Sequence, residues 1–300
     1  MLKGKCKEHN VILRIAISFL IGIGIIFLFN PHVLAQASNS EGSSSIAVVG
    51  VILGGLFGII GGIAAAIVTS TQKIKELKEE FRLHEKEQIR KEIAQLRRDY
   101  LNPLKLSADE LKERLKTLKN KQSDGAEAAR VRPWFVTIKD YITRDYRPDK
   151  NFSFSNWCNG GEGYFAVSTL YLTLAYFATA TRIREEMPFT ILVPKYNEYI
   201  KILTNHIEKT RMDFGGTYGI WEEIQDSIGR IALRSDGDIM DYKAFYTALM
   251  DDRTCSAFLR MADYYVDFKD KDFASIISSL EALLDEFDHD GVLYKELIEA

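Results

Sequence analysis

An uncharged stretch of 23 residues, Ile46 to Val68, constrains the fold of this chain more than any other feature of its sequence. A helix rises about 1.5 Å per residue, so this stretch is long enough to cross the roughly 30 Å hydrocarbon core of a bilayer. Residues 31–45 contain no lysine or arginine, whereas cations follow the stretch closely at Lys73, Lys75, Lys78 and Arg82. By the positive-inside rule, the sequence predicts a transmembrane helix whose C-terminal side is cytoplasmic.

Glycine recurs at every fourth position of the predicted transmembrane helix, at Gly50, Gly54, Gly58 and Gly62. Because a lipid environment gives apolar helices no hydrophobic drive to associate, close packing of small residues supplies much of the attraction between them. The repeat predicts a glycine zipper that packs against a second copy of the chain or against another membrane protein. The plainer interpretation is that glycine is common in membrane helices.

The first 37 residues have the layout of a secretory signal peptide. A basic start precedes an apolar run from Ile15 to Phe29, and small residues follow at Ala35 and Ala37, where signal peptidase would cleave. An uncleaved first membrane anchor is the alternative. Residues 38–45 would then form a short extracytoplasmic segment, and the chain is expected in a bacterial plasma (inner) membrane.

Charge divides the remainder of the chain into two regions. Thr71 to Lys121 contain 15 lysine and arginine residues against 10 acidic residues, whereas the part from Gln122 onward contains 20 against 30. This acidic balance argues against nucleic-acid binding by the distal region. The three cysteines show no paired spacing and fit reduced thiols in the cytoplasm better than disulfides.

Apolar residues at helical spacing predict an all-α fold beyond the membrane segment. Ile74, Leu77 and Phe81 form one such stripe, and others run along Leu203 and Ile207 and along Ile276 and Leu280. We expect charged juxtamembrane helices at 69–122, beginning with a stalk helix that is solvated or paired, and a cytoplasmic helical bundle or array at 123–300.

Several residues predict where these helices begin and end. Pro103 is expected to end the stalk, and Ser107 followed by Glu110 has the spacing of a capping box that opens the next helix. The polar stretch from Asn120 to Ala129 predicts a loop, and Pro133 is placed in the first turn of the helix after it.

Two further segments need a separate interpretation. Tyr164 to Thr181 lacks charge, but its hydroxyl groups and tyrosines favour a buried core helix over another membrane span. Only Phe189 to Val193 resembles a short strand.

Three blocks of sequence carry a resemblance to known proteins. They read RRDYLNPL at Arg97 to Leu104, VSTLYLTLAYFA at Val167 to Ala178, and GIWEEIQDSIG at Gly219 to Gly229. Together they resemble an uncharacterised family of bacterial membrane-anchored helical proteins. That resemblance implies no activity and no site residue.

The glycine-rich turn before the Tyr164 helix is a candidate ligand site. It reads NGGEG, with Asn159, Gly160, Gly161 and Gly163 as its candidate residues, and free N–H groups at a helix start can cradle an anion. The turn lacks the lysine and serine of a phosphate-binding loop. A flexible turn at a helix start is the structural alternative.

A second candidate is the acidic cluster formed by Glu222, Glu223 and Asp226. Helical spacing would bring two of these carboxylates together for acid–base or metal chemistry. Carboxylates in a first turn also simply complement the helix dipole, and no histidine lies at metal-ligand spacing. We therefore predict no metal and no cofactor.

The function predicted from these features is a membrane-anchored interaction, scaffold or signalling module without catalysis of its own. Its expected partners are the lipid bilayer, a second copy or another membrane protein reached through the transmembrane helix, and a cytoplasmic protein. The alternative is a ligand sensor or an enzyme that uses the NGGEG turn and the acidic cluster.

Overall fold

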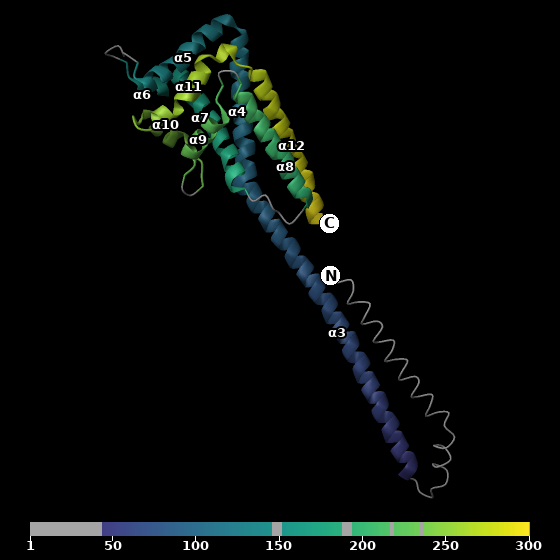
Figure 1. Ribbon diagram of the computed structural model, residues 1–300. Helices are drawn as coiled ribbons and strands as arrows, with labels where there is room; N and C mark the ends of the chain where they lie inside the picture. Colours follow the sequence, from purple (N-terminus) through teal and green to yellow (C-terminus); the bar gives the residue numbers. More distant parts are fainter. Residues whose placement is uncertain (1–43, 146–151, 188–193, 217–218, 235–236, 300) are drawn as a thin grey trace. The chain divides into compact units, whose positions relative to one another are not determined.

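The computed structural model describes residues 44–145, 152–187, 194–216, 219–234 and 237–299 (Figure 1). The predicted signal peptide at 1–37 and the predicted strand at Phe189 to Val193 lie outside the described residues. The chain divides into two compact units, Met1–Arg82 and Leu83–Ala300.

The described residues form helices, with no named strand among them. Their only β pairing is an isolated antiparallel bridge between Leu233 and Ile239. The predicted all-α fold is confirmed for this part of the chain.

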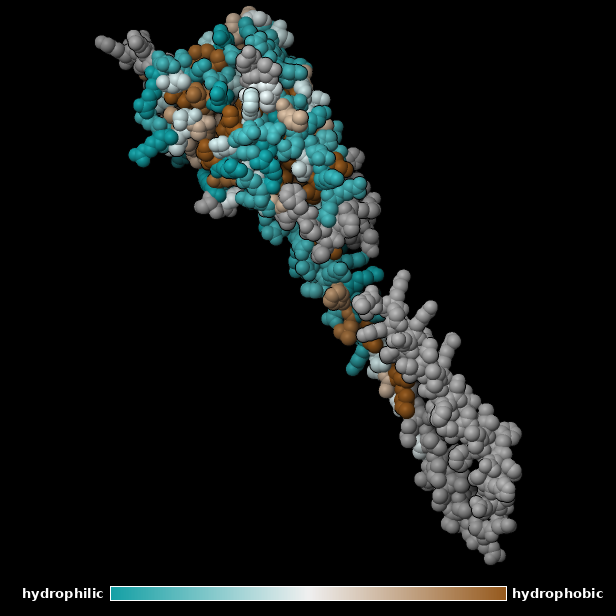
Figure 2. Space-filling model, in the orientation of Figure 1, coloured by the Kyte–Doolittle hydropathy of each residue, from teal (hydrophilic) through white to brown (hydrophobic). Residues whose placement is uncertain are grey.

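Unit 1 contains the first part of helix α3 (Ser44–Leu96). Thr69 and Thr71 donate their hydroxyls to the carbonyls of Ala65 and Ile67, at 2.8 and 2.7 Å, so these polar groups are satisfied within the helix. Large apolar side chains are nevertheless exposed here, and Figure 2 shows hydrophobic atoms on this part of α3. They belong to Ile63, Ile67, Val68, Ile74, Leu77 and Phe81.

Within the described residues, no helix combines the length and the apolar character that crossing a membrane requires. Of the predicted glycine zipper, Gly50 lies outside the described side chains, while Gly54, Gly58 and Gly62 are exposed.

Unit 2 begins with the end of α3, and the helical path continues through a π-helical turn, η1 (Arg97–Leu101), into α4 (Asn102–Ser123). Pro103 therefore lies in the first turn of α4, where its missing N–H costs no hydrogen bond. The predicted capping box is wrong, because Ser107 is buried inside α4. Its hydroxyl donates to the Leu104 carbonyl at 3.1 Å and lies 3.0 Å from that of Thr179.

Helix α5 (Gly125–Thr143) begins earlier than predicted. Its N-cap is Asp124, whose carboxylate accepts from the backbone N–H groups of Ala126 and Glu127. The loop predicted at 120–129 is therefore reduced to Asp124, the single residue between α4 and α5. Pro133 lies inside the helix, so its predicted place in the first turn is wrong, since the Asp124 cap starts the helix nine residues earlier.

Several other helices of unit 2 pack against α7 (Gly161–Glu186). Sixteen residues of α7 are buried, which confirms the predicted core helix. Its buried serine and threonine hydroxyls have partners, as in the 2.6 Å contact between Thr173 and the Tyr265 hydroxyl. The neighbours of α7 include α4, α5, α6 (Phe154–Asn159) and α9 (Glu222–Ala232).

Two further long helices of unit 2 are α8 (Pro194–Phe214) and α12 (Phe273–Glu299) (Figure 1). Helix α12 packs against both α4 and α8, and its Ile276, Leu280 and Leu283 are buried. The short helices α10 (Tyr242–Met250) and α11 (Leu259–Val266) complete the array, with 3₁₀ turns η2 (Cys255–Phe258) and η3 (Phe268–Asp270) on either side of α11.

Candidate functional site

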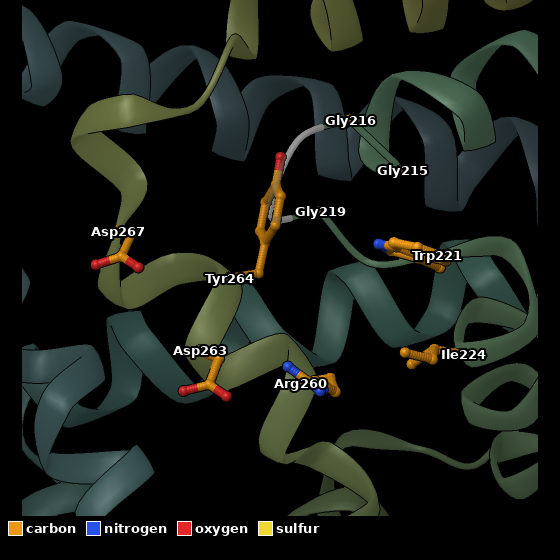
Figure 3. Close-up of a pocket in the computed structure, with 9 residues that line it drawn as sticks. All are labelled: Gly215, Gly216, Gly219, Trp221, Ile224, Arg260, Asp263, Tyr264 and Asp267. Carbon is orange, nitrogen blue, oxygen red and sulfur yellow. The ribbon is translucent and has the colours of Figure 1, made fainter.

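A hollow of about 1050 Å³ is formed by the α8–α9 connection, the start of α9, and α11 (Figure 3). In Figure 3, Trp221 and Ile224 lie on one side, Asp263 and Asp267 on the other, and the Tyr264 ring stands between them. We call this the Trp221 pocket. Its lining residues are Gly215, Gly216, Gly219, Trp221, Ile224, Arg260, Asp263, Tyr264 and Asp267.

Glycines shape one wall of the Trp221 pocket. A Cβ at Gly219 would lie 2.6 Å from the backbone carbon of Gly215 and 2.7 Å from the Gly216 carbonyl oxygen, so no larger residue fits. Backbone hydrogen bonds hold the chain on both sides of this turn. The Gly215 N–H donates to the Arg211 carbonyl at 3.0 Å, and the Ile220 N–H donates to the Phe214 carbonyl at 2.9 Å.

The protein constrains two acidic groups that line the Trp221 pocket. Asp263 pairs with Lys139 at 2.7 Å, and burial raises the pKa of Tyr264 well above its ordinary value. The Tyr264 phenol therefore stays protonated near neutral pH. Trp221 is 65% exposed at the rim and offers a large ring with an N–H donor.

The described residues contain no group of three potential metal ligands. The cysteines among them, Cys158 and Cys255, are buried, and burial raises the pKa of the Cys158 thiol to about 12. A thiol with that pKa stays protonated at neutral pH and is a poor nucleophile.

A buried charged cluster joins α7, α8 and α9 close to the pocket. Arg211 is 1% exposed and donates to Asp226 Oδ1 at 2.8 Å, to Gln225 Oε1 at 3.2 Å and to the Glu222 carbonyl at 3.3 Å. Gln225 in turn donates to the carbonyls of Arg211 and Ile220 at 2.9 and 2.6 Å. We call this the Arg211 cluster, and its bonds fix the turn that carries the glycines.

The predicted acidic residues do not act as one group in the structure. Asp226 is 8% exposed and bonds to Arg211 and Arg184, whereas Glu222 and Glu223 are exposed on the first turn of α9. Asp226 is therefore neutralised by two guanidinium groups, and the two glutamates lie where they complement the helix dipole.

The predicted NGGEG turn lies at the junction of α6 and α7, and none of its residues lines the Trp221 pocket. Asn159 donates to the Ser155 carbonyl at 2.9 Å, and Gly160 is the N-cap of α7. Gly163 has a packing role, because a Cβ there would lie 2.6 Å from the backbone carbon of Trp157. Gly161, in contrast, faces open space.

Sequence reasoning missed the Arg211 cluster, although a signal was present. The predicted apolar stripe of α8 ends with Leu203 and Ile207, and the next position at helical spacing is Arg211. A charged residue that continues a buried stripe requires a partner of opposite charge, which pointed to a carboxylate on a neighbouring helix.

Comparison with known proteins gave no match, since no family model, no curated protein and no solved structure proved similar to the chain.

Proposed function

We propose that this protein is a membrane-anchored helical interaction module, in which α3 joins copies of the chain and unit 2 binds a cytoplasmic protein. The observation that carries the proposal is the exposure of apolar side chains along α3: Ile74, Leu77 and Phe81 are 52%, 63% and 71% exposed. Large apolar groups in a row on one helix are usual where a partner or a membrane covers them.

The anchor of the module is the uncharged segment Ile46 to Val68, and its packing surface is the glycine zipper. A Cβ added at Gly54, Gly58 or Gly62 meets nothing within 4 Å, so the backbone of a second helix has room to approach. The cations that follow, from Lys73 to Arg82, support an orientation in which unit 2 lies on the cytoplasmic side. The membrane we propose is a bacterial plasma membrane.

Binding of a cytoplasmic protein fits the Trp221 pocket. A largely exposed tryptophan lines the same pocket as the Arg260 and Asp267 side chains, so the pocket offers an apolar anchor together with charges of both signs. Partly exposed tryptophan and arginine are the residue types that dominate protein interfaces.

The self-association is tested with the double variant Gly54→Ile and Gly58→Ile. Its control is Ile63→Phe with Ile67→Phe, because each isoleucine follows one of these glycines by nine residues, about two and a half helical turns, and lies on the opposite face. In-membrane crosslinking should yield dimers or higher oligomers for the native chain and the control, and monomers for the glycine variant.

An unchanged oligomeric state in the glycine variant would refute the zipper. Membrane anchoring is tested separately by alkaline extraction of membranes from cells, in which the protein should stay in the pellet. Recovery in the soluble fraction would refute the anchor.

A further inference from the structure

A second hollow lies between α4, α7 and α10, with a volume of about 570 Å³. Pockets of this size hold small organic ligands. Its walls include Arg114 of α4, Tyr164 and Tyr171 of α7, and Tyr242 of α10. We call it the tyrosine groove.

The floor of the tyrosine groove contains a half-buried guanidinium group with neutral partners. One nitrogen of Arg114 donates to the Phe165 carbonyl at 2.9 Å, to the Ser168 hydroxyl at 2.9 Å and to the Thr169 hydroxyl at 3.2 Å. The guanidinium carbon lies 4.4 Å from the centre of the Phe165 ring. None of the ion pairs within the described residues includes Arg114, although a half-buried cation normally has an anionic partner.

Three tyrosine rings line the groove at steep angles to one another. The Tyr171 and Tyr242 rings are 5.4 Å apart and nearly perpendicular, at 89°, and the Tyr164 ring lies 5.7 Å from that of Tyr242 at 57°. Aromatic rings set at such angles present several faces to one guest, which is the arrangement that binds alkylated ammonium groups.

The acidic residues around the tyrosine groove differ in their pairing. Asp109 pairs with Lys112 at 2.7 Å, and Glu113 pairs with Lys116 at 3.3 Å. Glu110 forms no ion pair within the described residues, although it stands one helical turn before Arg114. The groove thus presents one positive and one negative group, neither of which forms an ion pair within the described residues.

We propose that the tyrosine groove binds a small zwitterion. The anionic group of the ligand pairs with Arg114, and its alkylated ammonium group lies against the rings of Tyr164, Tyr171 and Tyr242 on the side of Glu110. A ligand with both charges satisfies both protein groups at once, whereas a simple anion is repelled by Glu110 and a simple cation by Arg114. This site is independent of the membrane anchor and of the Trp221 pocket.

The test uses phosphocholine as the probe, with choline and inorganic phosphate as its two halves. The full chain is titrated calorimetrically in maltoside detergent, which carries no choline. Phosphocholine should bind saturably, at least about tenfold more tightly than either half, because a charge-assisted hydrogen bond contributes roughly that factor. No saturable binding of phosphocholine, or equal binding of choline alone, overturns the proposal.

Three variants assign the binding to the groove. Arg114→Met and Glu110→Gln should each weaken phosphocholine binding by about tenfold, while Lys119→Met removes a cation from α4 outside the groove and should leave binding unchanged. Glu110 is exposed and unpaired, so its variant tests the site even where Arg114→Met fails to fold. If Glu110→Gln binds phosphocholine as tightly as the native chain does, the proposal of a zwitterion site is overturned, since the ammonium group would then need no carboxylate.

Discussion

Replacement of Arg211 by methionine tests the Arg211 cluster, because methionine keeps much of the volume and removes the charge. The variant leaves Asp226, which is 8% exposed, with Arg184 as its remaining cation, and it leaves the Gln225 oxygen without its donor. Loss of one partner from a buried pair typically costs 3–5 kcal/mol. Since Arg184 still neutralises Asp226, we expect the free energy of unfolding to fall by about 3 kcal/mol.

The matched control is Arg230→Met. Arg230 is also bonded to a carboxylate, that of Glu185 at 2.5 Å, but its side chain is 60% exposed. Solvent screens such a pair, so its loss should cost at most about 1 kcal/mol. The comparison isolates burial, because both variants remove one arginine that is bonded to an acidic residue.

Urea unfolding of the full chain, followed by tryptophan fluorescence, measures both variants. A double-mutant cycle of Arg211→Met with Asp226→Leu should show a coupling free energy of at least about 1 kcal/mol. The reason is that Asp226→Leu removes the carboxylate that Arg211→Met deprives of one of its two cations. If Arg211→Met costs no more than Arg230→Met, the cluster contributes nothing specific and the reasoning from burial is refuted.

Two further predictions concern the junction of α6 and α7. Gly163→Ala should lower the free energy of unfolding by about 1–3 kcal/mol, because its Cβ meets the backbone of Trp157, whereas Gly161→Ala faces open space and should be neutral or stabilising; urea unfolding distinguishes them. The raised pKa of Cys158, about 12, contributes stability that is fully present below the pKa of an unfolded thiol, about 8.5, and is lost as the pH rises towards 12. Between pH 8 and pH 10 the native chain should therefore lose about 1–2 kcal/mol more than Cys158→Ala, and equal losses would contradict the assignment.

Sequence periodicity predicted the helical class and the buried faces of α8 and α12. The stripe that includes Leu203 and Ile207 is buried, as is the one at Ile276 and Leu280, because packing against neighbouring helices removes these apolar faces from water. Helix boundaries were less predictable. Pro103 and Pro133 were both expected to mark the limits of helices, yet a π turn and the Asp124 cap govern those positions.

Local sequence also predicted groups of residues without showing which of them meet. Glu222, Glu223 and Asp226 follow one another on α9, but their neighbours come from α7 and α8, and only Asp226 points into the bundle. The tyrosine groove likewise depends on tertiary packing, since its walls come from three helices that are far apart in the chain.

The sequence by itself determined the helical class, the buried stripes and the uncharged segment from which a membrane anchor is predicted, because these depend on composition and on the 3.6-residue period of a helix. The tertiary structure alone decided the Arg211 cluster, the packing role of Gly163, and the pairing of Arg114 with neutral oxygens. Each of these depends on which helices lie side by side, and a one-dimensional pattern does not specify the neighbour across an interface.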